Sequence, residues 1–175
     1  MFNRRRFLQT AAGAAGIAGL HAAGLLSSSA GAAEVAPADR PLKILFLGGT
    51  GFIGPHQIEY ALARGHEVTM FNRGRKAGMY GGRVEEMVGN RDTKIDDGLK
   101  PLEGDRKWDV VVDNSGYVPR HVRDAVELLK DRCGRYIYVS TVAAYDKSTP
   151  GRFAEDGPID GMADASVEDF TWETY

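Results

Sequence analysis

The sequence predicts an α/β fold built on a doubly wound parallel sheet, and three features of the chain indicate it. Short apolar runs, suited to strands buried on both faces, recur between residues 42 and 140. Segments with helical periodicity separate some of these runs. The first run ends in the glycine-rich turn GGTGFIG at residues 48–54. Strands that alternate with helices through short loops form parallel sheets with right-handed crossovers.

The first predicted strand and helix lie on either side of the glycine-rich turn. Residues Leu42 to Leu47 are almost continuously apolar, and a second strand is predicted at Glu67 to Phe71. The helix between them is expected to begin near Pro55 and to end at Gly65. Its apolar residues follow the i, i+3, i+4 spacing and are Ile58, Ala61 and Leu62.

The second half of the domain continues the alternation. Further strands are predicted at residues 84–88, where two glutamates interrupt the apolar run, at Trp108 to Asp113 and at Tyr136 to Ser140. The segment Thr93 to Glu103 has too little periodicity for more than a short helix. A longer helix follows Pro119 and is expected to end at Gly134. Its apolar stripe consists of Val122, Ala125, Val126 and Leu129.

The glycine-rich turn indicates a phosphate cradle. Gly49, Gly51 and Gly54 fit the pattern G-x-G-x-x-G between a strand and a helix, which is the fingerprint of dinucleotide-binding Rossmann folds. The predicted cofactor contacts in the turn are therefore Gly48, Gly49, Thr50, Gly51, Phe52, Ile53 and Gly54. The alternative is a merely structural turn. A nucleoside-triphosphate loop is excluded, because Pro55 and His56 stand where that motif needs Lys and Ser or Thr.

Residues 1–33 are predicted to be an export signal rather than part of the fold. Arg4, Arg5 and Arg6 precede Phe-Leu, an Ala/Gly/Leu-rich stretch and a run of small residues. Paired arginines followed by Phe-Leu resemble a twin-arginine signal. The alternatives are an ordinary secretory signal or a membrane anchor, although the apolar stretch is shorter than the ~20 residues that span a bilayer. Residues 34–41 are a linker, and residues 42–175 are the expected NAD(P)-binding Rossmann domain.

Charge and cysteine content argue against several classes of partner and site. The leader holds three basic and no acidic residues, so the rest of the chain has 19 basic and 24 acidic residues and a formal charge of −5. This balance argues against a nucleic-acid surface, and we expect no stable membrane insertion. The single cysteine, Cys133, is expected to be a small buried side chain near a helix end. No Cys/His cluster has the spacing of metal ligands, so no metal site is predicted.

The last segment has no strand or helix pattern. Residues 146–175 contain two prolines, several glycines and many acidic residues. We therefore expect an irregular loop, and a Rossmann domain that is incomplete at its C-terminus, as in a fragment of a longer protein.

Three segments together resemble the extended short-chain dehydrogenase/reductase superfamily, within it the NAD-dependent epimerase/dehydratase family. They are GGTGFIG after the first strand, Asn114-Ser115-Gly116 after the fourth, and Tyr138-Val139-Ser140-Thr141 running to Tyr145. The resemblance implies that Thr141, or alternatively Ser140, hydrogen-bonds the reacting oxygen of the substrate. It also implies a Tyr-x-x-x-Lys pair, whose tyrosine would be Tyr175 and whose lysine would follow the printed sequence.

The cofactor is predicted to be NAD(P), with NADP favoured. Asn72 stands where a carboxylate would bind the ribose of NAD, and Arg73 follows it. A guanidinium can bind the additional phosphate of NADP. The resemblance further places Asp92 beside the adenine, and Asn114 and Ser115 along the cofactor.

The function predicted is an NAD(P)-dependent oxidoreductase or epimerase/dehydratase-type enzyme. It would transfer hydride at a carbinol or ketone carbon of a small-molecule substrate, with a sugar-like molecule as one candidate, and the resemblance implies a homodimer for the full-length protein. The alternative is a non-catalytic dinucleotide-binding or RNA-binding module, since residues 72–74 also resemble a chloroplast stem-loop RNA-binding branch of the superfamily. Lysine four residues beyond Tyr175 would favour the enzyme.

Overall fold

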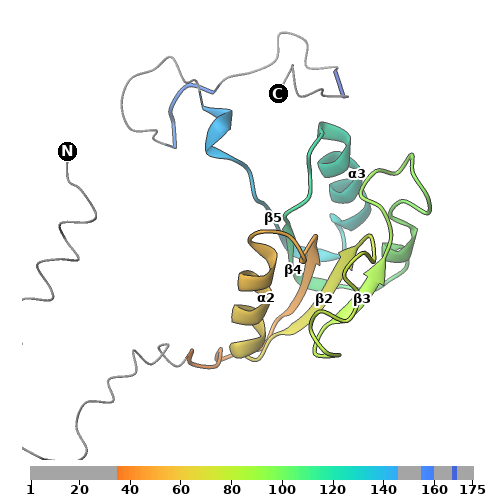
Figure 1. The fold of residues 1–175 in the computed structure, drawn as a ribbon. Coiled ribbons are helices and arrows are strands. Elements are labelled where there is room, and N and C mark those ends of the chain that lie inside the picture. The colour runs from red at the N-terminus through yellow and green to blue at the C-terminus, as the bar shows by residue number, and fades with distance from the viewer. Residues whose placement is uncertain (1–34, 146–154, 160–166, 169–175) are drawn as a thin grey trace, which may run out of the picture. The chain divides into compact units, whose positions relative to one another are not determined.

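Five parallel strands form the sheet in the order β3-β2-β1-β4-β5, which confirms the predicted doubly wound architecture (Figure 1). The computed structural model describes residues 35–145, 155–159 and 167–168; the predicted export signal and Tyr175 lie outside them. The strands are β1 (Lys43–Leu47), β2 (Glu67–Asn72), β3 (Glu85–Val88), β4 (Trp108–Asp113) and β5 (Cys133–Tyr138).

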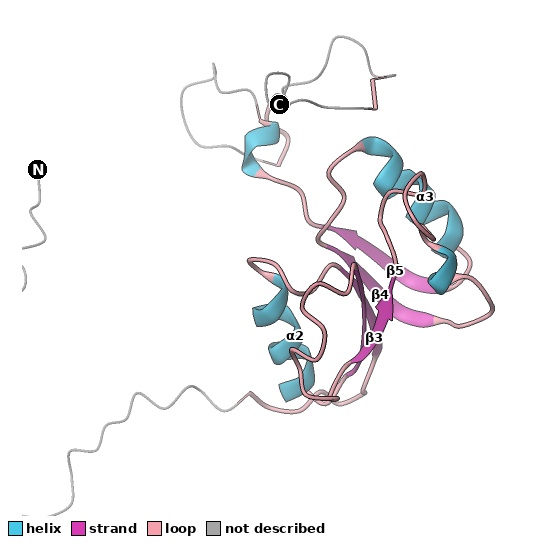
Figure 2. Cartoon of the chain, turned by 45° about the vertical axis from the view of Figure 1, so that its right-hand side comes forward, coloured by secondary structure: helices cyan, strands magenta, loops and turns pink. Residues whose placement is uncertain are grey.

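The central strands β1 and β2 are buried along most of their length because helices cover both faces of the sheet there. Helix α2 (Gly54–Ala63) packs on one face and α3 (Pro119–Leu129) on the other (Figure 2). In β1, Ile44 and Phe46 join the cluster under α2, whereas Leu45 and Leu47 join the cluster under α3. Successive side chains of a strand point to opposite faces of the sheet, so the residues of β1 belong alternately to the two cores.

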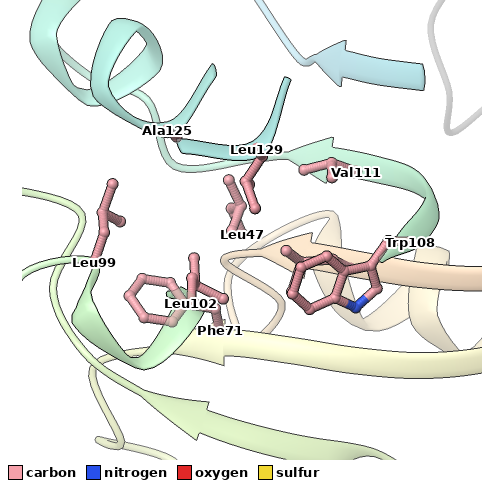
Figure 3. Packing of buried hydrophobic residues seen from close by; sticks show 9 residues of the cluster. Leu47, Phe71, Leu99, Leu102, Trp108, Val111, Ala125 and Leu129 are labelled. Carbon is pink, nitrogen blue, oxygen red and sulfur yellow. The ribbon is translucent and has the colours of Figure 1, made fainter. Parts of the chain in front are cut away.

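The core under α3 contains most of the large buried side chains. Figure 3 shows Phe71, Leu102 and Trp108 gathered beneath Leu129 of the helix. Leu102 belongs to a single 3₁₀ turn, Lys100–Leu102, which is the short helix expected between residues 93 and 103. The segment between β3 and β4 forms no α-helix, and this 3₁₀ turn covers part of the sheet in its place.

The prediction that Gly134 ends the second helix was wrong. Helix α3 ends at Leu129, and Gly134 lies inside β5, which begins at Cys133 and ends at Tyr138. A Cβ on Gly134 would come within 2.9 Å of the Asp109 carbonyl oxygen in β4, so close strand pairing accounts for this glycine. Cys133 is half-buried at the start of a strand, and burial raises the pKa of its thiol.

The order of the strands determines where a site can form. The chain winds from β1 to β3 in one direction and then returns to β4 on the other side of β1. Ligands of open α/β sheets bind in the crevice outside the carboxyl ends of the strands at this reversal. In the part of the chain that the structure describes, no helix is both long and apolar enough to span a membrane.

Candidate functional site

A groove of about 500 Å³ opens at the carboxyl ends of β1, β2 and β4. Its walls come from the glycine-rich turn, the loops after β2 and β3, and the segment between β4 and α3. Two predicted cofactor contacts, Gly49 and Asp92, do not line it. The predicted contacts that do line it are Gly48, Thr50, Gly51, Phe52, Ile53, Gly54, Asn72, Arg73, Asn114 and Ser115.

Packing explains the absence of a side chain at three glycines of the turn but not at Gly51. A Cβ on Gly49 would lie 2.5 Å from Ile58 Cδ1, and one on Gly54 would lie 2.6 Å from the backbone of Gly49. Gly48 has φ +82°, and its Cβ would lie 2.9 Å from Ser115 Cβ. A Cβ on Gly51 would meet no atom within 4 Å. Gly51 thus lines the groove and has open space where its Cβ would stand.

The N-terminus of α2 begins immediately after the turn. Its N-cap residue, Ile53, makes no side-chain cap, and its first turn contains no acidic residue. The partial positive charge of the helix N-terminus therefore remains available to an anion. Asn114, which follows β4, is bonded to both the turn and α2, since its Nδ2 donates to Gly48 O at 3.1 Å and to Gln57 Oε1 at 2.6 Å.

Cationic side chains line the groove although the whole chain carries a net charge of −2. The basic residues are Arg73, Arg75 and Lys76 in the loop after β2 and Arg91 after β3, and none of the described lining residues is Asp or Glu. The first three form no ion pair with a carboxylate of the described residues. A groove lined by charge of one sign concentrates ligands of the opposite sign.

Unpartnered polar atoms also collect at the groove. Seven buried side-chain nitrogen and oxygen atoms lack a hydrogen-bond partner among the described residues. Six of these seven belong to residues that line the groove, namely Asn72, Arg91, Asn114 and His121. Because buried polar groups are nearly always hydrogen-bonded, such a concentration marks these groove residues as an unusual polar environment.

A buried charged network lies beneath the groove. The carboxylate of Asp113, at the end of β4, is fully buried and accepts from Arg91 Nη2 and Tyr136 Oη, both at 2.6 Å. Arg91 Nη2 also donates to the carbonyl of His121 at 2.8 Å. Burial and the nearby Asp113 charge raise the pKa of Tyr136 far above its usual range. Tyr136 is therefore held as a hydrogen-bond donor to Asp113.

Asp92, predicted to contact adenine, lies behind the groove with its carboxylate engaged by another side chain. Arg120 Nη2 donates to Asp92 Oδ2 at 2.6 Å, and this contact holds the pKa of Asp92 well below its usual range. The groove positions after β3 are instead Gly89, Asn90 and Arg91. Together with His121, they are lining residues that the sequence reasoning missed. Asn90 and Arg91 follow β3 closely, which is a weak sequence signal, whereas His121 lies in the first turn of α3, where no sequence signal marked it.

The two predicted catalytic residues are not brought together in the described part of the structure. Thr141 follows β5, and its exposed hydroxyl accepts from the amide nitrogen of Ala143 at 3.2 Å. It does not line the groove, and Tyr175 lies outside the described residues. Their catalytic roles therefore stay predictions.

Comparisons of the sequence with known proteins give a family match and a curated relative. The model of the NAD dependent epimerase/dehydratase family matches residues 44–164. The chloroplast stem-loop binding protein of 41 kDa b from Arabidopsis thaliana is 32% identical over 133 residues, which cover 67% of this chain and 34% of that protein. The chain thus spans about a third of this curated relative.

Solved structures share the fold at low sequence identity. The Bordetella bronchiseptica enzyme WbmG in complex with NAD is 17% identical with a TM-score of 0.58, and the match covers 72% of this chain and 46% of that one. A UDP-glucose 4-epimerase is 16% identical with a TM-score of 0.57, covering 67% of this chain and 41% of that one. Both likenesses extend over less than half of the longer protein.

Proposed function

Because the chain belongs to the NAD-dependent epimerase/dehydratase family, we propose that its groove binds a nicotinamide dinucleotide for hydride transfer at a carbinol or ketone carbon of a small molecule. The residues present fit such a cofactor. Gly51 leaves open space beside a helix N-terminus without acidic residues. The observation that carries the proposal is the cationic lining of the groove, with no carboxylate among its described residues.

Each part of the dinucleotide has a suitable partner in the chain. The turn at residues 48–54 and the start of α2 suit the pyrophosphate. Asn72 and Arg73, at the end of β2, suit the adenosine ribose and its phosphate. Asn114 and Ser115 lie on the β4 side of the groove, where they would hold the remainder of the cofactor.

The catalytic part of the proposal rests on Thr141 and Tyr175. When bound, the nicotinamide supplies or accepts the hydride. Thr141 would orient the substrate oxygen, and Tyr175 would move its proton. A phenol with a pKa of about 10 costs about 4 kcal/mol to ionise at pH 7, so Tyr175 needs a cation close by.

The preference for NADP can be tested at Arg73. Arg73→Met is expected to weaken NADPH binding by at least about tenfold and to leave NADH binding unchanged, because only NADPH carries the phosphate that the guanidinium would bind. Fluorescence titration of the protein with both dinucleotides measures this. Arg135→Met is the control, because Arg135 is an exposed arginine of β5 outside the groove. Equal losses for both dinucleotides at Arg73→Met would contradict the assignment.

A non-catalytic role in RNA binding is the second candidate, and the printed name of the Arabidopsis relative favours it. Arg73, Arg75 and Lys76 are exposed and could contact RNA phosphates. Adding a stem-loop RNA to the NADPH titration separates the two functions. Displacement of NADPH by RNA at physiological salt would favour the RNA-binding role, whereas NADPH binding unaffected by RNA favours the oxidoreductase.

Export by the twin-arginine route completes the proposal, because Arg4, Arg5 and Arg6 precede an apolar stretch and small residues. Residues 1–33 fused to a folded reporter are expected to carry it out of the bacterial cytoplasm. Changing the three arginines to lysine keeps the charge and is expected to stop export. Fractionation of the cells provides the measurement, and equal export of both fusions would argue for an ordinary secretory signal instead.

A further inference from the structure

We propose that Lys76 binds the pyrophosphate of the dinucleotide rather than the additional phosphate of NADP, an inference that rests on the proposed function. Lys76 belongs to the loop after β2, yet its Nζ donates to the carbonyl oxygen of Thr50 in the glycine-rich turn at 3.1 Å. Thr50 directly precedes Gly51, where the groove is open. The ammonium of Lys76 is thus held at the phosphate side of the groove.

The loop that carries Lys76 is attached on both sides of it. On one side, the amide of Gly74 donates to Asn72 Oδ1 at 2.6 Å. On the other, Tyr80 is buried, and its hydroxyl donates to the carbonyl of Gly49 at 2.6 Å. The loop is therefore attached to the end of β2 and to the glycine-rich turn, which limits where the Lys76 side chain can reach.

The end of the loop is attached to the helix that begins at the cradle. Arg83 donates to the two carboxylate oxygens of Glu59 in α2, at 2.8 Å and 2.6 Å. This pair is exposed, so its energetic contribution is small. Its geometry nevertheless connects the loop, α2 and the turn in one unit around the groove.

The electrostatics around Lys76 favour an anion. Its recorded partner, Thr50 O, is neutral, and no carboxylate of the described residues pairs with Lys76. The uncapped N-terminus of α2 lines the same groove and carries partial positive charge. A phosphate between the ammonium and the helix N-terminus would interact favourably with both.

Arg73 and Arg75 differ from Lys76 in their contacts with the glycine-rich turn. They line the groove, but neither forms a recorded hydrogen bond to the glycine-rich turn. The loop thus divides its cations between two phosphates. Lys76 serves the pyrophosphate that NAD and NADP share, whereas the arginines serve the phosphate that only NADP carries.

The test compares four proteins in titrations with NADH and with NADPH: the full chain, Lys76→Met, Lys76→Arg and Lys76→Gln. Lys76→Met is expected to weaken the binding of both dinucleotides by about tenfold and by the same factor. Lys76→Arg is expected to restore most of the affinity. Lys76→Gln separates two roles, because it can still donate to Thr50 O but carries no charge; we expect it to bind as weakly as Lys76→Met.

The control is Lys107→Met, which removes the same charge at the exposed position before β4, at the amino end of the sheet. Its affinities are expected to equal those of the unchanged protein. Loss of NADPH binding alone, or full affinity in Lys76→Gln, would overturn the assignment of Lys76. Failure of the unchanged protein to bind either dinucleotide would instead overturn the proposed function.

Discussion

Replacing Gly51 by alanine is expected to weaken dinucleotide binding by at least about tenfold, which is about 1.4 kcal/mol, without loss of stability. A Cβ at this position would contact no protein atom within 4 Å, so nothing in the fold opposes it. The added methyl group would occupy the space through which the pyrophosphate approaches the backbone. Titration with NADPH measures the loss, and urea unfolding measures the stability.

Gly54→Ala is the matched comparison, because it makes the same chemical change three residues later. Its Cβ would lie 2.6 Å from the backbone carbon and oxygen of Gly49, so α2 must move away from the turn. Forced overpacking of this kind costs about 1–3 kcal/mol. Gly54→Ala should therefore lose both stability and binding, and Gly51→Ala only binding. Unchanged NADPH affinity in Gly51→Ala would place the ligand elsewhere.

The features that the sequence predicted correctly have their causes in neighbouring residues. All residues of β1 after Lys43 are buried, so the strand is a continuous apolar run. The glycine-rich turn is likewise contiguous; within it, Gly54 is required by contact with the backbone of Gly49, and Gly49 by contacts with Ile58 of α2 and Met70 of β2. The alternation of strands with helices likewise predicted the parallel sheet.

Gly134 shows where this reasoning fails. A glycine after a helical stripe satisfies the rule for a helix end, but it satisfies equally well a close approach between strands. The deciding contact is with the carbonyl of Asp109, which is 25 residues away in the sequence. The local sequence pattern cannot show that Gly134 and Asp109 lie beside each other in neighbouring strands.

The buried charged network beneath the groove was missed for the same reason. Arg91, Asp113 and Tyr136 belong to three separate parts of the chain, and only the parallel sheet brings them together. Sequence alone shows an arginine, an aspartate and a tyrosine near strand ends. Burial and pairing, which decide their roles, arise from tertiary packing.

Asp113→Asn is expected to destabilise the protein by about 3–5 kcal/mol, because it leaves the buried guanidinium of Arg91 without a counter-charge. The Arg91 and Asp113 side chains are only 9% and 0% exposed, so water cannot replace the lost carboxylate. A loss of this size is a large fraction of the total stability of a small domain, about 5–15 kcal/mol. Urea unfolding followed by circular dichroism measures it.

Asp109→Asn provides the control in the same strand. Asp109 pairs with Arg40 at 2.9 Å, but the two side chains are 36% and 75% exposed. Such a pair contributes about 0–1 kcal/mol, and asparagine can still accept from the amide of Lys43. If Asp113→Asn does not fold, Tyr136→Phe offers a milder test, with an expected loss of about 1 kcal/mol for its hydrogen bond. Equal stability of the Asp113 and Asp109 variants would mean that no buried charge pair supports the floor of the groove. The cationic lining would then have to be held in place by the loops alone.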